Sequence, residues 1–161
     1  MRRRVSPGSV FSLRFFAYLL LFSIGFWLFS VHEHLGPVQR AIAWLSTLVQ
    51  QGTGGHAIAR GDDILIKSMV ININHECTGV FVYMLFVSFV LAYPAPWMGR
   101  FAGLAIGMPL IFAVNVLRLA TLARVVEIYP QAFFYLHEYV WQGIFTVLVL
   151  LAAIAWAERV E

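Results

Sequence analysis

Four long apolar stretches alternate with polar segments along the chain. The stretches contain no charged residue and no histidine, and they cover Phe15–Val31, Cys77–Gly99, Phe101–Leu117 and Tyr139–Ala157. A helix that crosses a bilayer needs roughly 20 mostly apolar residues. The pattern therefore predicts four transmembrane helices in one membrane domain. Their predicted limits are about residues 13–31, 77–95, 101–119 and 137–157, within a domain that covers residues 1–161.

The segment 32–76 between the first two stretches contains two further patterns. From Pro37 to Val49 apolar residues recur with a helical period and include a tryptophan, which is typical of a helix lying in the membrane interface. After a glycine-rich break, residues 62–74 are rich in β-branched side chains and end in an alternation of Ile and Asn, which predicts extended strands. We therefore expect an all-α integral membrane protein with an interfacial helix and a short extracytoplasmic β-like lid that leads directly to Cys77.

The composition agrees with a membrane location. Hydrophobic residues make up 61% of the chain and charged residues 12%, and the mean hydropathy is +0.81. These values exclude an ordinary soluble domain. The chain has one cysteine, which excludes an internal disulfide and leaves the redox compartment open.

The basic residues predict how the helices are oriented. Arg2, Arg3, Arg4 and Arg14 precede the first helix, and cytoplasmic segments of membrane proteins are enriched in Arg and Lys. We therefore expect both termini on the cytoplasmic side of the inner membrane and segment 32–76 on the outer side. The first apolar stretch exceeds the core of a signal peptide, about 7–15 residues, and no small-x-small cleavage site follows it, so we expect it to be retained.

Three reactive side chains stand at ends of the predicted helices. Cys77 begins the second helix, Arg118 ends the third and His137 begins the fourth, so this topology places all three at the outer surface. A thiolate is favoured by the positive end of a helix and by neighbouring cations. Asn115 lies three residues before Arg118, on the same helical face. We therefore predict a Cys/Arg/His site, although each residue taken singly also has a structural explanation in packing or anchoring.

The order and spacing of these residues resemble the exosortase/archaeosortase family, in particular its compact stand-alone members. The resemblance rests on a Cys-x-Gly segment at a helix start, an Asn-x-x-Arg segment at a helix end and a histidine that opens the last helix; the matching residues here are Cys77, Asn115, Arg118 and His137. It extends from about Asn74 to Trp156. One departure is Trp141, four residues after the histidine, where members of the family often have glycine.

The resemblance implies a membrane-embedded cysteine transpeptidase or protease. Such enzymes cleave the C-terminal sorting signal of secreted proteins near the outer face of the cytoplasmic membrane, through a thioester, and transfer the protein to an acceptor. The signal consists of a short motif, a transmembrane helix and a basic tail. The implied partners are such proteins, membrane lipid and an acceptor molecule of open identity; we expect no cofactor, no metal and no nucleic acid partner.

The resemblance also implies roles for the individual residues. Cys77 is the expected nucleophile, His137 the group that exchanges protons with the thiol and the leaving amine, and Arg118 the group that stabilises the oxyanion or the thiolate. Asn115 is expected to orient Arg118 or to donate a further hydrogen bond. Glu76 and Thr78 are further candidates for substrate binding or support.

Several alternatives stay open from the sequence. The chain has the composition of a non-enzymatic membrane subunit as well, in which Cys77 only packs. A His/Cys metal site is another alternative; its ligands would come from His32, Glu33, His34, His75, Cys77 and His137. His75 is an alternative to His137 as the base. Gly103 and Gly107 form either a face for a substrate helix or a site of internal packing.

Overall fold

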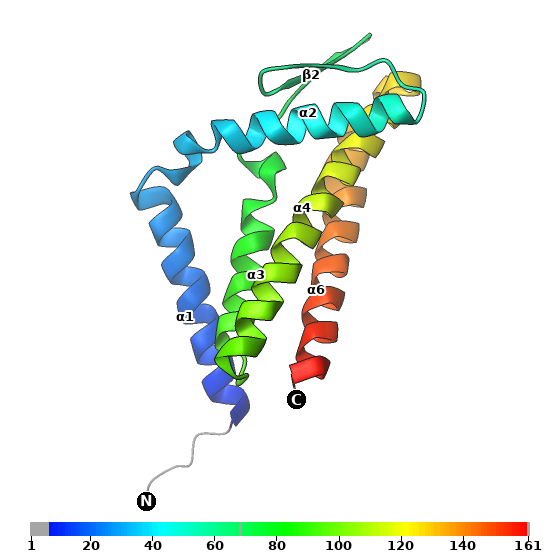
Figure 1. Ribbon diagram of the computed structural model, residues 1–161. Coiled ribbons are helices and arrows are strands. Elements are labelled where there is room, and N and C mark those ends of the chain that lie inside the picture. The colour runs from blue at the N-terminus through cyan, green and yellow to red at the C-terminus, as the bar shows by residue number, and fades with distance from the viewer. Residues whose placement is uncertain (1–6, 68, 161) are drawn as a thin grey trace, which may run out of the picture.

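The computed structural model describes residues 7–67 and 69–160. Long helices stand side by side, and a further helix and a small sheet lie across the end of the bundle that is opposite both termini (Figure 1). The elements, in chain order, are α1 (Pro7–Leu28), α2 (Gly36–Gly52), β1 (Ile58–Arg60), β2 (Asp63–Ile66), β3 (Met69–Asn72), α3 (Val80–Ala92), α4 (Trp97–Ile128), α5 (Phe133–Tyr135) and α6 (Trp141–Val160).

Three helical segments are long and apolar enough to cross a membrane: Gly8–Leu28, Trp97–Ile128 and Pro130–Val160. Helix α3 is equally apolar but has 13 residues, because a 3₁₀ turn precedes it and two prolines, Pro94 and Pro96, follow it. Together with the small sheet, these helices confirm the expected all-α membrane fold. Arg2, Arg3 and Arg4, which predict the orientation, lie outside the described residues.

Helix α2 lies across the end of the bundle and packs on α4 (Figure 1). Its inner face is buried and partly polar, and the Ser46 hydroxyl donates a hydrogen bond of 3.2 Å to the Val116 carbonyl. Its outer face exposes Trp44 and Leu48. A helix with one apolar exposed face and one packed face is suited to the membrane interface, as the sequence pattern predicts.

A cluster of polar side chains joins the end of α2 and the start of the sheet to α4. The buried carboxylate of Glu127 accepts hydrogen bonds from Gln50 Nε2 at 2.7 Å and Arg124 Nη1 at 3.0 Å, and it lies 3.0 Å from His56 Nδ1. The other end of the Gln50 amide accepts a hydrogen bond from the Ala57 backbone amide at 3.1 Å. We call Gln50, His56, Arg124 and Glu127 the lid latch.

The sheet has the order β1-β2-β3, with both pairs antiparallel. Its inner face buries Ile64, Ile66 and Ile71, and Ile73 continues this face beyond β3. These residues form one core cluster with the inner face of α2, the upper part of α4 and Cys77. The expected β-like lid is thus a three-stranded sheet whose last strand leads directly to Cys77.

A second core cluster joins α3, α4 and α6 below the site. Helix α4 comes close to its neighbours at two glycines. A Cβ atom on Gly103 would collide with the indole of Trp156, and one on Gly107 would collide with the ring of Phe86. The Trp156 indole also donates a hydrogen bond of 3.0 Å to the Gly99 carbonyl. Gly103 and Gly107 were expected to form either a face for a substrate helix or a site of internal packing, and the structure supports internal packing.

Candidate active site

Cys77 lies in a 3₁₀ turn, Glu76–Thr78, between the sheet and α3. Its backbone amide lies 3.1 Å from both the side-chain oxygen and the carbonyl of Asn74, which closes the turn. Gly79 then adopts a left-handed conformation with φ of 75°, from which α3 begins. A glycine is required here, because a Cβ atom would also lie 3.3 Å from the ring of Phe145. The turn holds the Cys77 side chain buried at the head of α3.

The thiol of Cys77 is in contact with the imidazole of His137. Cys77 Sγ lies 3.7 Å from His137 Nε2, although sixty residues separate them in the sequence. His137 belongs to a π-helical segment, Leu136–Val140, that precedes α6. Phe133 stacks on the imidazole with ring centroids 5.4 Å apart and an interplanar angle of 15°. The other ring nitrogen of His137, Nδ1, lies 3.4 Å from the exposed carboxylate of Glu138.

Asn115 is fully buried on α4 and faces the same turn. Its amide nitrogen donates a hydrogen bond of 2.8 Å to the backbone carbonyl of Cys77. Asn115 was expected either to orient Arg118 or to donate a further hydrogen bond. In the structure it donates a hydrogen bond, and the acceptor is the backbone carbonyl of Cys77. A buried amide that holds the carbonyl of this residue keeps its sulfur at a constant position relative to α4.

Arg118 follows one turn later on α4 and is also buried, with 3% of its surface exposed. Its guanidinium carbon lies 5.6 Å from the centre of the Phe145 ring, a cation–π contact. In the part of the chain that the structure describes, Arg118 Nε and Asn115 Oδ1 are buried atoms without a hydrogen-bond partner. Unpaired buried polar atoms are costly, and these two belong to residues three apart on one face of α4.

Burial and charge act on the Cys77 thiol in opposite directions. Burial raises the pKa of Cys77 above its ordinary value, because the charged thiolate loses water. The positive charge of Arg118 and the backbone hydrogen bond within the turn lower this pKa, while the carboxylates of Glu76 and Glu138 raise it further. The net direction is upward, so the thiol keeps its proton at neutral pH until a base removes it.

The two remaining candidates have smaller parts in this arrangement. The Thr78 side chain is buried, and its hydroxyl donates a hydrogen bond of 2.6 Å to the His75 carbonyl, which stabilises the turn. Glu76 is exposed at the start of the turn. Thr78 therefore supports the turn, and Glu76 acts on the thiol through its charge.

His75 points to another part of the molecule. Its ring lies among those of Phe26, Trp27, His32 and Phe81, with centroids 5.9 to 6.5 Å away. Among the described residues, no group of three or more His, Cys, Asp and Glu side chains is arranged to hold a metal ion. The imidazole in contact with the Cys77 sulfur belongs to His137.

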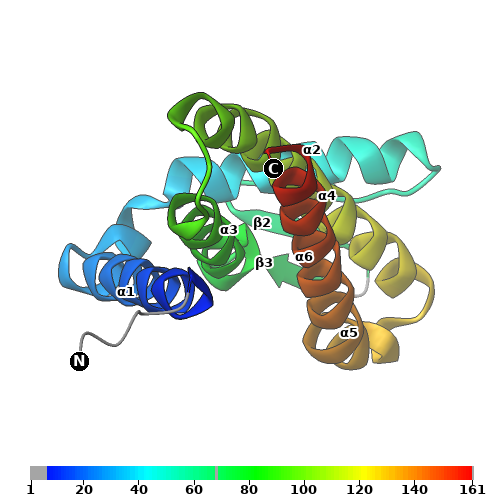
Figure 2. The same ribbon diagram turned by 90° about the horizontal axis from the view of Figure 1, so that it is seen from below.

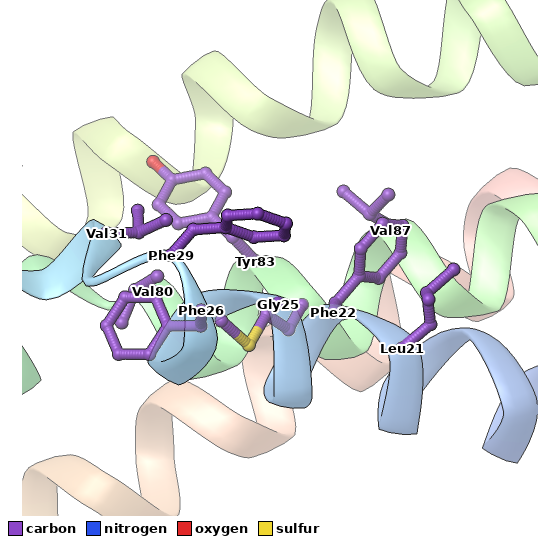
Figure 3. A pocket seen from close by; sticks show the side chains of 10 residues that line it. Leu21, Phe22, Gly25, Phe26, Phe29, Val31, Val80, Tyr83 and Val87 are labelled. Atoms are coloured by element: carbon purple, nitrogen blue, oxygen red, sulfur yellow. The ribbon is translucent and has the colours of Figure 1, made fainter.

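An apolar groove of about 380 Å³ lies between α1 and α3 (Figure 3). Phe22, Phe26 and Phe29 come from α1 and its end, and Val80 and Tyr83 come from α3. The Tyr83 hydroxyl donates a hydrogen bond of 3.3 Å to the Met108 carbonyl of α4. Apart from Tyr83, the described residues that line the groove have apolar side chains or, at Gly25, none.

Sequence reasoning missed three residues of the site. Asn74 closes the turn, Phe133 stacks on His137, and Phe145 lies against Arg118. An Asn three residues before a cysteine is a signal for such a turn, because its side chain commonly binds a nearby backbone amide. The two phenylalanines carry no signal, since each belongs to an apolar helix in which phenylalanine is common.

Comparison with known proteins extends the resemblance over most of the chain. No curated protein and no solved structure matches it. The family of transmembrane exosortases matches residues 5–156, a range that includes the sheet, the Cys77 site and every helix except the last four residues of α6. A match over this much of the sequence shows that the chain belongs to the transmembrane exosortase family.

Proposed function

We propose that this protein is a membrane-embedded cysteine transpeptidase or protease that cleaves the C-terminal sorting signal of secreted proteins. The observation that carries the proposal is the contact of 3.7 Å between Cys77 Sγ and His137 Nε2, beside the buried guanidinium of Arg118. A nucleophile, a base within reach of it and a fixed positive charge are the parts that acyl transfer requires. The family supplies the substrate class.

In the first step, His137 Nε2 accepts the thiol proton and the Cys77 sulfur attacks the carbonyl carbon of the scissile peptide bond. The negative charge that develops on the carbonyl oxygen is stabilised by Arg118, which is charged at any working pH. When the tetrahedral intermediate collapses, the C–N bond breaks and the imidazolium returns its proton to the leaving amine. The products are a Cys77 thioester and the released C-terminal helix of the substrate.

In the second step, an amine or hydroxyl of the acceptor attacks the thioester carbon. His137 takes the proton of this nucleophile and passes it to the departing sulfur, which restores the thiol. Water in place of the acceptor gives hydrolysis. The raised pKa of Cys77 fits this scheme, because the thiol depends on the neighbouring imidazole for its activation.

Arg118 is the residue whose position is hardest to explain without such a function. A charged side chain buried in a membrane-spanning helix is costly and marks functional sites in membrane proteins. Its Nε atom has no hydrogen-bond partner among the described residues. The substrate carbonyl, and the oxyanion formed from it, is the partner that we assign to the guanidinium.

The proposal includes a location and an orientation. We propose that the protein lies in the cytoplasmic membrane, with both termini cytoplasmic and segment 32–76 outside, so that Cys77 meets secreted proteins at the outer surface. A substrate held by its own transmembrane helix presents its cleavage point at a constant depth, which supplies orientation before the chemistry begins.

The test is co-expression of a candidate substrate that carries a motif, a transmembrane helix and a basic tail with the wild type and with variants. We expect the wild type to remove the C-terminal helix, measured by the mass of the product. Cys77→Ala and His137→Ala abolish cleavage, and Arg118→Ala lowers its rate about 100- to 1000-fold, the effect of losing an oxyanion donor. Cleavage that survives Cys77→Ala rejects the mechanism, and a wild type inactive on such substrates rejects the function.

A further inference from the structure

Among the residues that the structure describes, one edge of the sheet is covered and the other, which belongs to β3, has no backbone hydrogen-bond partner. Strand β1, at the other side, packs against α2, whereas β3 packs mainly on β2. Seen along the bundle, β3 lies between α3 and α6, on the side of the sheet that is away from α2 (Figure 2). The strand that leads to Cys77 is therefore the one whose outer side is open.

The hydrogen-bond pattern shows which backbone groups face outward. The Ile73 amide donates to the Asp62 carbonyl at 2.9 Å, and Asn72 is paired with Asp63. In an antiparallel ladder, residues that exchange hydrogen bonds alternate with residues whose amide and carbonyl turn away from the partner strand. Ile73 and Ile71 thus bond to β2, while Val70 and Asn72 direct their amides and carbonyls to the free edge.

The side chains place this edge beside the candidate active site. Ile71 and Ile73 are buried in the same core cluster as Cys77, and Phe133, Leu136 and Trp141, which flank His137, pack against this cluster. The outward residues are accessible: 53% of the Val70 surface is exposed, and Asn72 is exposed as well. Asn72 precedes Cys77 by only five residues.

We propose that the free edge of β3 binds the substrate segment on the N-terminal side of the scissile bond as an added strand. The proposal rests on the proposed function and assigns its peptide-binding surface. Unpaired edge amides and carbonyls are ready to pair with an extended peptide, and such pairing contributes affinity that does not depend on the peptide side chains. The added strand runs parallel to β3, because β3 continues into the apolar helix α3 and the substrate segment continues into its own apolar helix.

The size of the edge selects this occupant over a second copy of the chain. A four-residue strand buries far less than the roughly 1200 Å² that a specific protein–protein interface needs. A substrate that is already held by its transmembrane helix needs only a short additional contact. At about 3.3 Å per residue, an extended peptide that reaches Cys77 places its preceding residues along β3.

Disulfide trapping tests the proposal, because Cys77 is the only cysteine of the chain. Cys77→Ala removes it, and Val70→Cys then adds one thiol on the exposed face of β3, next to the free edge. Single cysteines are placed at successive positions of the candidate substrate on the N-terminal side of its motif, and the two proteins are co-expressed and oxidised in membranes. We expect disulfides at every second substrate position, since alternate side chains of a strand share one face.

Ile58→Cys in the same Cys77→Ala background is the matched control. Ile58 lies on β1, at the opposite edge, and is about as exposed as Val70, at 61%. We expect at least tenfold less disulfide from this position. Equal trapping at both positions, or trapping at Val70→Cys without alternation along the substrate, overturns the proposal.

A second measurement uses the enzyme with its cysteine in place. Val70→Pro removes one of the two outward amides of β3, that of residue 70, and leaves the hydrogen bonds to β2 intact. We expect cleavage to fall at least tenfold while the rate of alkylation of Cys77 stays unchanged, which shows an intact site. If the Val70→Pro variant cleaves at the wild-type rate, the added strand is overturned and the proposed function is not. If the wild type never cleaves, the proposed function is overturned. The disulfide trapping does not require catalysis, so its result holds in either case.

Discussion

Cys77 combines a buried sulfur with a neighbouring base and a fixed positive charge. Burial opposes ionisation and Arg118 favours it, and the balance leaves the pKa of the thiol raised. A free, highly reactive thiolate at a membrane surface would be oxidised or alkylated readily. In the proposed mechanism, His137 activates the thiol only when a substrate arrives, which avoids this reactivity in the resting state.

Alkylation of Cys77 by iodoacetamide should show this raised pKa. The thiolate fraction, and with it the rate, should rise with pH and reach its midpoint above the ordinary thiol value of 9.0. Replacing Arg118 by Gln removes the charge that lowers this pKa, so the midpoint should move further upward. The rate is followed by mass spectrometry over about pH 6 to 10.5. A midpoint near neutral pH in the wild type would contradict the prediction.

Phe145 is the residue that positions Arg118, through the cation–π contact of 5.6 Å. Phe145→Leu keeps an apolar side chain but removes the ring, a contact worth about 0.5–2 kcal/mol. We expect cleavage to fall about tenfold, the equivalent of about 1.4 kcal/mol, and the alkylation midpoint of Cys77 to move upward as Arg118 shifts. Phe145→Tyr, which keeps a ring, should restore both values in part.

Phe86→Leu is the control for Phe145→Leu. Phe86 is equally buried and belongs to the same core cluster, but it packs against Gly107 on the lower part of α4. This variant should lower the Tm to a similar extent and leave the alkylation profile of Cys77 unchanged. An equal shift of the profile in both variants would mean that packing, and not the ring beside Arg118, determines it.

At the scale of elements, the site depends on how α2 and the sheet are attached to α4. The lid latch joins these parts through the Glu127 carboxylate, which is 8% exposed and accepts charge-assisted hydrogen bonds. The sheet then leads to the turn of Cys77. We expect the latch to keep the edge of β3 and Cys77 in one arrangement.

Glu127→Gln tests the latch. The loss of the negative charge weakens the contacts to Arg124 and His56, each worth about 1.5–3 kcal/mol for a charged partner. We expect faster amide hydrogen exchange in β1, β2 and β3 and little change in α6. Glu158→Gln, on the last part of α6, is the control and should leave exchange in the sheet unaltered. Unchanged exchange in the Glu127 variant would show that hydrophobic packing alone holds the sheet.

At the scale of the whole molecule, the polar chemistry is concentrated at one end of the helices. Helix α4 runs along the bundle to the end covered by α2 and the sheet (Figure 1), and Asn115 and Arg118 both belong to the second half of this helix. The lower part of the bundle is held by apolar packing, including Trp156 at Gly103. This division suits the proposed substrates, which have one apolar helix and one polar cleavage point.

Several features were predictable from the sequence alone. Apolar stretches of helical length must be helices in a bilayer, because every backbone amide and carbonyl there needs an internal partner. The alternation of Ile and Asn before Cys77 predicted strands, and the spacing of Cys77, Asn115, Arg118 and His137 pointed to the family that the comparison then showed. The sequence could name these residues because reactive side chains are rare in apolar segments.

Other features were decided only by the tertiary structure. The partner of Asn115, the ring beside Arg118 and the packing at Gly103 depend on how helices far apart in the chain approach one another. The free edge of β3 depends on which strand α2 covers. A residue pattern records whether a side chain is polar or apolar and how often it recurs. The pattern does not record which surface a side chain contacts, because packing between helices depends on shape and contact across the whole core.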